Sequence, residues 1–94
     1  MRRAAKVDAN QKEIVKALRA IGASVYSIGE PVDLLVGFRK RTIALEIKNL
    51  DGRDNLTAQQ RQFFATFNGE AYIVHGVGDA LKAVLNAPGA QQTA

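Results

Sequence analysis

Apolar and polar positions along the chain recur with two periods, and the first segment has the helical one. Ile14 and Leu18 are four residues apart, which places them on one face of a helix. We expect this helix to run from Asp8 to Ile21 and to end at Gly22. Asp8, with Gln11 three residues later, matches a capping box at the start of the helix.

Short apolar segments bounded by glycine, proline or charged residues predict four strands. They are rich in branched side chains and too short for stable helices. The predicted strands are Ala23–Ile28, Leu34–Val36, Ile43–Leu45 and Glu70–His75. The basic run Arg39-Lys40-Arg41 separates the second strand from the third, which predicts a hairpin between Pro31 and Asn49 with a solvent-exposed turn.

The register of this hairpin follows from the length of its loop. If the loop has an even number of residues centred between Arg39 and Lys40, the numbers of directly paired residues sum to 79. Asp33 then lies opposite Glu46 on the same face of the sheet, with side chains roughly 5 Å apart. An odd loop without a bulge would place the two carboxylates on opposite faces.

The second half of the chain predicts two more helices around the last strand. Thr57 and Gln60 form a capping box at the start of the first of them. Three phenylalanines at helical spacing are expected to pack in the core: Phe63, Phe64 and Phe67. Asp79 is expected to cap a final helix, Ala80–Asn86. The elements therefore run helix, three strands, helix, strand, helix, which predicts a small α/β domain.

Length and composition limit the classes of protein to consider. The 94 residues allow one small domain, which we expect to span residues 8–86 between a flexible basic arm (1–7) and a disordered polar tail (87–94). There is no cysteine, which excludes disulfides and thiolate metal sites and is compatible with a reducing cytoplasm. No apolar run reaches membrane-spanning length. The net charge of +4 favours an anionic partner such as nucleic acid.

Two carboxylates that face each other across a hairpin repel, so this arrangement does not help stability. A divalent cation would reverse the sign of the interaction. Mg²⁺ prefers oxygen ligands and keeps several waters, so Asp33, Glu46 and the backbone carbonyl of Ile47 would suffice to hold it. Lys48 would then orient a water or stabilise charge on a phosphate. The alternative is a half-exposed strand in which Glu46 and Lys48 form a weak surface cluster.

The same residues carry a resemblance to a known family. Asp33, twelve intervening residues and then Glu46-Ile47-Lys48 resemble the core motif of the PD-(D/E)XK nucleases. The order of the surrounding segments resembles one branch, the virus-type replication-repair nuclease (VRR-Nuc) family, over nearly the whole chain. In that family a proline usually precedes the aspartate directly, whereas here Val32 separates Pro31 from Asp33. The matching segments are DANQKEIVKALRAIGASV, PVDLLVGF, TIALEIKN and LTAQQRQFF.

The resemblance implies a fold and an activity. The expected fold is a restriction-endonuclease-like αβββαβ core with a central mixed sheet flanked by helices. The expected activity is Mg²⁺- or Mn²⁺-dependent hydrolysis of phosphodiester bonds in branched DNA, such as Holliday junctions or flaps, by a homodimer in the cytoplasm of a phage-infected or bacterial cell. A non-catalytic basic nucleic-acid-binding module with the same fold is the alternative.

The resemblance also assigns supporting roles. Gln60, in the pattern LTxxQ, is expected beside the catalytic residues, although pure helix capping explains it equally. Relatives often place an acid on the first helix, where Gln11 stands here and Glu13 is the nearest acid; capping is again the alternative for Gln11. Losing that acid makes a second metal ion less expected.

The remaining charged residues have two interpretations each. The turn residues Arg39, Lys40 and Arg41, together with Arg53 in the next polar loop, are expected to contact DNA phosphates, with a solvated surface as the alternative. The same choice applies to three basic residues on the outward face of the first helix: Lys12, Lys16 and Arg19. His75, the only histidine, is expected to have a structural role.

Overall fold

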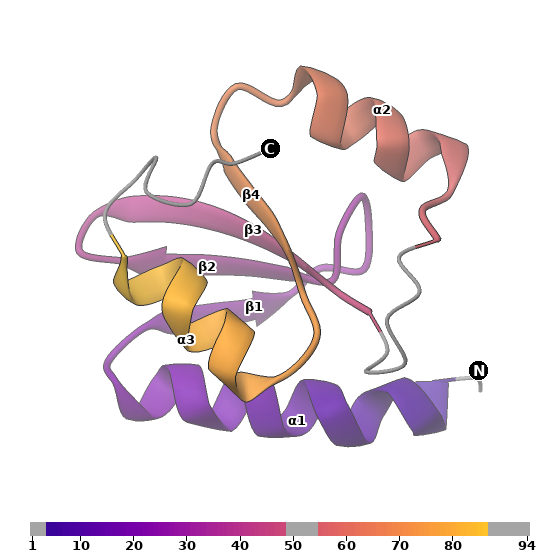
Figure 1. Cartoon of the computed structure of the whole chain (residues 1–94). Helices are drawn as coiled ribbons and strands as arrows, with labels where there is room; N and C mark the ends of the chain where they lie inside the picture. The colour runs from indigo at the N-terminus through magenta and orange to yellow at the C-terminus, as the bar shows by residue number, and fades with distance from the viewer. Residues whose placement is uncertain (1–3, 49–54, 87–94) are drawn as a thin grey trace.

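The computed structural model describes residues 4–48 and 55–86, the first five of them as backbone only. Its described helices and strands follow the predicted order (Figure 1). They are α1 (Ala4–Ala20), β1 (Ser24–Ser27), β2 (Leu34–Phe38), β3 (Arg41–Ile47), α2 (Ala58–Thr66), β4 (Glu70–Val74) and α3 (Val77–Leu85). The predicted α/β class and the αβββαβ order are therefore confirmed.

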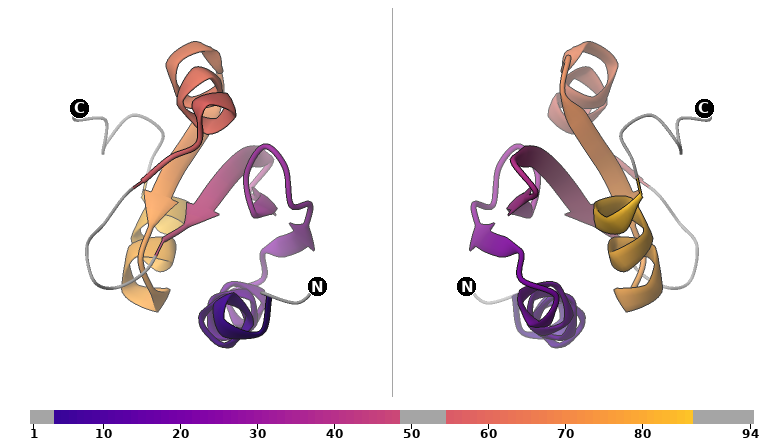
Figure 2. Two further views of the ribbon diagram at one scale, coloured as in Figure 1. Left: turned by 90° about the vertical axis from the view of Figure 1, so that its right-hand side faces the viewer. Right: turned by 90° about the vertical axis from the view of Figure 1, so that its left-hand side faces the viewer.

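The four strands form one mixed sheet in the order β1-β2-β3-β4. The first two pairings are antiparallel and β3 pairs with β4 in parallel. Because a parallel connection needs a crossover, the segment that contains α2 runs from the end of β3 back to the start of β4. Helices α1 and α3 cover one face of the sheet, and α2 lies on the other side (Figure 2).

The core lies between the sheet and the pair α1 and α3. Alternate residues of β2 and β3 point into it, and these side chains are fully buried together with Ile14 and Leu18 of α1. The buried strand residues are Val25, Leu34, Val36, Ile43, Leu45, Ile47 and Val74. The intervening residues of β3, which include Glu46, therefore face the side on which α2 lies.

Helix α1 begins four residues before the predicted start. Ala4, Ala5 and Lys6 are good helix formers and no glycine or proline interrupts them, so the helix extends through residues 4–7. Residues 4–7 therefore belong to α1, and the predicted capping box at Asp8 is wrong because Asp8 lies inside the helix. The predicted end is confirmed: Gly22 has a φ of 95°, and the amides of Gly22 and Ala23 donate to the carbonyls of Arg19 and Leu18, which is a Schellman motif.

Helix α2 corrects a second prediction, since none of its residues is buried. Phe63 and Phe64 are half-buried and Phe67 is 43% exposed, so the three rings are not core residues. They contact one another instead: Phe63 stacks on Phe67 with ring centroids 4.6 Å apart and meets Phe64 edge-on at 5.4 Å. Helical spacing predicts that these rings share one face of α2, but the rest of the protein covers little of that face.

Helix α3 begins at Val77, with Gly76 as its N-cap, and not at the predicted Asp79 cap. Asp79 lies in the first turn and reaches back, where its carboxylate accepts hydrogen bonds from the backbone amide and ring Nδ1 of His75. These bonds, the backbone one first, lower the pKa of Asp79. The carbonyl of His75 accepts from Asn10 of α1 at 3.3 Å, so His75 joins two helices, in line with the predicted structural role.

Candidate active site

The β2–β3 hairpin brings Asp33 and Glu46 together in the predicted register. Observed pairs such as Leu34 with Leu45 and Phe38 with Arg41 have residue numbers that sum to 79, because the loop contains two residues. Asp33 directly precedes β2 and lies across from Glu46 in β3. The prediction that the two carboxylates are neighbours is therefore confirmed.

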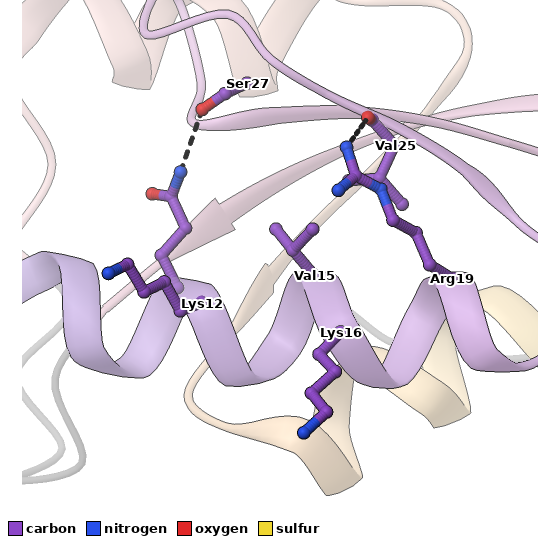
Figure 3. Close-up of a pocket in the computed structure, with 7 residues that line it drawn as sticks. Lys12, Val15, Lys16, Arg19, Val25 and Ser27 are labelled. Carbon is purple, nitrogen blue, oxygen red and sulfur yellow. Dashed lines mark hydrogen bonds between the residues drawn. The ribbon is translucent and has the colours of Figure 1, made fainter.

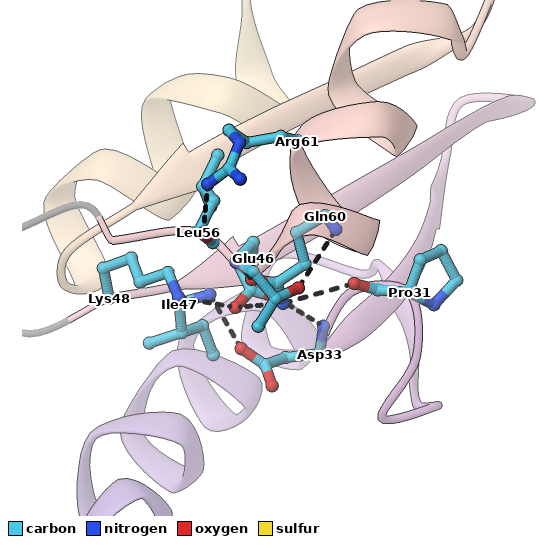
Figure 4. Close-up of polar contacts among 9 residues, drawn as sticks. Pro31, Asp33, Glu46, Ile47, Lys48, Leu56, Gln60 and Arg61 are labelled. Carbon is cyan, nitrogen blue, oxygen red and sulfur yellow. Dashed lines mark hydrogen bonds and ion pairs between the residues drawn. The ribbon is translucent and has the colours of Figure 1, made fainter.

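Glu46 is the centre of a polar cluster, which we call the carboxylate site and define as Asp33, Glu46, Lys48 and Gln60. The Glu46 residue is only 4% exposed. Its Oε2 atom accepts from Gln60 Nε2 at 2.9 Å and lies 3.2 Å from Lys48 Nζ. Its Oε1 atom accepts from the backbone amide of Asp33 at 3.2 Å. Figure 4 shows these side chains turned toward one another from the start of β2, from β3 and from α2.

The side chain of Asp33 also bonds to β3, in addition to its backbone amide. Its Oδ2 atom accepts from the amide of Ile47 at 2.8 Å, so the hairpin is closed by two reciprocal bonds between backbone and carboxylate. Lys48 donates its amide in the other direction, to Val74 of β4. Since the N–H and C=O groups of one residue in a strand point to the same side, the carbonyl of Ile47 lies on the Asp33 side, as the prediction required.

Val32, which separates Pro31 from Asp33, is fully buried. The carbonyl of Pro31 accepts a second bond from Gln60 Nε2 at 3.4 Å. Val32, the additional residue, therefore packs in the core, and Asp33 still bonds to β3. The departure from the family pattern does not displace the carboxylate.

The surroundings of Glu46 disfavour its charged form. Burial, and secondly the negative charge of Asp33, raise the pKa of Glu46; the contacts from Lys48 and Gln60 oppose this shift. A positive charge between the two carboxylates would offset both causes. In the described residues no three or more His, Cys, Asp or Glu side chains form a metal-binding group. The candidate donors are thus two carboxylates and one backbone carbonyl, which suits Mg²⁺ because this ion keeps several of its waters.

Gln60 fulfils both roles that the sequence left open. Its Oε1 atom accepts from the Thr57 amide and its own amide donates to the Thr57 hydroxyl, which confirms the capping box. Its Nε2 group remains available and binds Glu46 and Pro31. One side chain therefore fixes the start of α2 and attaches α2 to the carboxylate site.

Gln11 and Glu13 are not part of the carboxylate site in the described residues. Gln11 lies inside α1 and donates through Nε2 to the hydroxyl of Ser27 at 2.9 Å, so it neither caps the helix nor contacts a carboxylate. Glu13 is exposed on α1. Ser27 pairs with Leu34, the residue after Asp33, so Gln11 ends one strand away from the site.

The basic turn lies at the opposite end of the hairpin from the carboxylates. Six residues separate Asp33 from Arg39, which in a strand is roughly 20 Å. Arg39 and Lys40 are exposed and have φ angles of 53° and 66°, the values of a type I′ turn. The Arg39 guanidinium lies 4.8 Å from the centre of the Phe38 ring. Both side chains remain available to a partner, far from the site.

Arg41 differs from its neighbours in the basic run, because its guanidinium is engaged within the fold. Its guanidinium forms a two-point ion pair with Glu70 of β4, at 2.9 and 2.7 Å. It also donates to the last carbonyls of α3, those of Ala83 and Val84, at 3.3 and 2.6 Å. These contacts use four of its five N–H donors, so this side chain joins β3, β4 and α3. The sequence offers no local signal for this, because Glu70 and α3 are distant along the chain.

The fourth predicted phosphate contact, Arg53, lies outside the described residues.

No family model, curated protein or solved structure matches this chain. The described helices include none that is both long and apolar enough to cross a membrane.

Proposed function

We propose that the protein is a Mg²⁺- or Mn²⁺-dependent endonuclease that hydrolyses phosphodiester bonds in branched DNA. The observation that carries this proposal is that Asp33, Lys48 and Gln60 all contact one buried carboxylate, that of Glu46. An acid that is buried opposite a second acid does not help the fold. The arrangement is understandable if the two acids share a cation during catalysis.

The carboxylates of Asp33 and Glu46 and the carbonyl of Ile47 would hold the cation. A divalent ion there supplies Lewis-acid polarisation of the phosphate and lowers the pKa of water. Lys48 is 18% exposed and places its ammonium group 3.2 Å from Glu46, where it can orient the attacking water or stabilise charge that develops on the phosphate. Gln60 positions Glu46 by its hydrogen bond to Oε2.

The small size of the domain favours recognition of DNA shape, and branched DNA is the substrate that the family resemblance implies. A chain this small has little surface for reading bases, so recognition of DNA shape through the backbone is expected. A Holliday junction needs two symmetric nicks, which a twofold homodimer supplies. We place this action in the cytoplasm of a bacterial or phage-infected cell, in keeping with the cysteine-free sequence.

One observation favours a second function, a non-catalytic module that binds DNA. Both oxygens of Glu46 already have protein partners, as a structural carboxylate would. In that case the cluster joins the hairpin to α2 and has no chemical task. The two functions differ in whether Glu46 and Lys48 affect cleavage or only stability.

The deciding experiment is nicking of a labelled four-way junction in Mg²⁺, in Mn²⁺ and in chelator. The wild type is compared with Glu46→Gln, Lys48→Ala and a control, Lys82→Ala, which removes an exposed lysine of α3. We expect Lys82→Ala to cut like the wild type, and Lys48→Ala to cut at least about 100-fold more slowly. Glu46→Gln should reduce cutting to the level in chelator. Circular dichroism verifies that each variant is folded.

Two results would reject the nuclease. One is a wild type that cuts no faster than the chelated control, and the other is Lys48→Ala or Glu46→Gln variants that retain wild-type rates. Binding that persists without metal or cleavage would then support the module. The same assay on duplex, flap and splayed-arm DNA, beside a mass measurement in solution, tests the substrate class and the dimer.

A further inference from the structure

A basic groove runs between α1 and the edge strand β1, apart from the carboxylate site. Its α1 side is lined by Lys12, Lys16 and Arg19, and its β1 side by Val25 and Ser27. The hollow has a volume of about 410 Å³, and none of its lining residues is acidic. We call it the α1–β1 groove (Figure 3).

The two lysines of the groove have no task in the fold. Both are exposed, and within the described part of the chain neither forms an ion pair or a hydrogen bond with another side chain. In Figure 3 Lys16 extends from α1 on the side away from Val25 and Ser27, and Lys12 extends along the helix. Among the side chains that the structure describes, these two positive charges on one helix face have no ion-pair partner, and placing like charges together does not stabilise a helix.

Arg19 and the strand edge add hydrogen-bond donors to these charges. Arg19 donates to the carbonyl of Val25 at 2.9 Å, which shows that the backbone groups of Val25 point outward from the sheet. Because N–H and C=O of one residue point the same way and Val25 lies on an edge strand, its amide faces the groove as well. Backbone amides and basic side chains are the common ligands of nucleic-acid phosphates.

The spacing of the charges suits a nucleic-acid backbone. Along α1, Lys12 and Lys16 are separated by roughly 6 Å, and Lys12 and Arg19 by roughly 10 Å. Over that length of the duplex axis, each strand of B-form DNA carries about three phosphates. A groove with three cations at this spacing complements a continuous polyanion better than it does a single small anion.

One end of the groove lies one strand away from the carboxylate site. At one end Gln11 binds Ser27, and Ser27 pairs with Leu34, which directly follows Asp33. At the other end the groove approaches the close of α1 at Gly22. Gly22 and the basic turn residues Arg39 and Lys40 line the next hollow. Exposed basic residues thus line both hollows, from α1 to the β2–β3 turn.

We propose that the α1–β1 groove binds the sugar-phosphate backbone of the DNA strand that leads to the carboxylate site. This inference rests on the proposed function in taking DNA as the substrate. It adds a path for the DNA, along α1 and the edge of β1, and it gives Lys12 and Lys16 the role of phosphate contacts.

The test measures DNA binding in chelator, so that no cleavage occurs. Fluorescence anisotropy of a labelled four-way junction is recorded over a range of salt concentrations for the wild type, Lys16→Gln, Lys12→Gln/Lys16→Gln and the control Lys82→Gln. Each phosphate-binding lysine that is replaced should reduce the magnitude of the slope of log K against log [salt] by about 0.9. We expect the double variant to lose about 1.8 in slope and at least about tenfold in affinity near 0.1 M salt, while Lys82→Gln matches the wild type.

The inference is overturned if the double variant keeps the affinity and salt slope of Lys82→Gln, or if the wild type binds no DNA. It is also overturned if polyglutamate binds the wild type as tightly as DNA and loses affinity with the same substitutions, because the groove then serves an acidic protein. A change in slope without any nicking in Mg²⁺ upholds the groove and rejects the nuclease. If the wild type nicks DNA in Mg²⁺ but the lysine variants keep its salt slope, the nuclease is upheld and the role of the groove is rejected.

Discussion

The turn between β2 and β3 offers a substitution whose effects on stability and on DNA binding have opposite signs. Lys40 has a φ of 66°, in the left-handed region, where an L-residue with a side chain costs about 1–2 kcal/mol. Glycine removes this cost but loses roughly 0.5–1 kcal/mol through its greater freedom in the unfolded chain. We therefore expect Lys40→Gly to stabilise the protein by up to about 1 kcal/mol.

The comparison that isolates the strain is Lys40→Ala. Alanine removes the charge of Lys40 but keeps the unfavourable left-handed backbone, so its stability should stay within about 0.5 kcal/mol of the wild type. Arg39 is left in place in both variants because its guanidinium lies over the Phe38 ring, an interaction worth roughly 0.5–1 kcal/mol at an exposed site.

Thermal and urea unfolding measure the difference between the two variants. For a domain of this size, 1 kcal/mol raises Tm by about 4–8 °C. The urea midpoint should rise with no change in m, since the surface exposed on unfolding is the same. If Lys40→Gly is no more stable than Lys40→Ala, the turn is not strained. In DNA binding the two variants should behave alike and both lose about 0.9 in salt slope if Lys40 meets a phosphate; unequal losses would refute a purely electrostatic role.

Three further outcomes follow from the polar contacts. Arg41→Ala should destabilise the protein by about 2–3 kcal/mol in urea unfolding, because it leaves the largely buried Glu70 unpaired and removes donors from the end of α3. The hydrogen bond from Arg41 lowers the pKa of Glu70. The stabilisation by the charged Glu70 is therefore complete above its unfolded pKa, near 4.5, and is lost as the pH falls through its folded pKa. Glu70→Gln should abolish this part of the acid dependence of stability. Gln60→Ala should reduce both stability and nicking, whereas Thr57→Ala, which removes only the cap, should reduce stability alone by about 1 kcal/mol.

The register of the hairpin was predictable from the sequence because side-chain alternation and a two-residue loop leave one pairing. The same holds for the end of α1, where only glycine adopts the required φ readily. The capping role of Gln60 was predictable from its spacing to Thr57, whereas its place beside Glu46 was expected only from the family resemblance. These are local features, which depend on residues a few positions apart or on a single hairpin.

The features that the sequence did not reveal depend on distant partners. Arg41 stands in a basic run and looks like its neighbours, but Glu70, which is 29 residues away, and the end of α3 draw it into the fold. The phenylalanines of α2 share a face, and nothing in their spacing tells that the sheet leaves this face only half covered. The start of α1 was missed because Asp8 is a good cap in isolation, while the residues before it also favour a helix.

The residues that disfavour the fold are the ones that the proposed function uses. Glu46 is buried opposite another acid, and Arg39 and Lys40 occupy left-handed positions that Asn-Gly would fill at lower cost. Lys12 and Lys16 place two charges on one helix face, and neither has an ion-pair partner among the described side chains. Under the proposed function, a polyanionic substrate in the α1–β1 groove and a cation at Asp33 and Glu46 would account for the buried acids and for the lysines of α1.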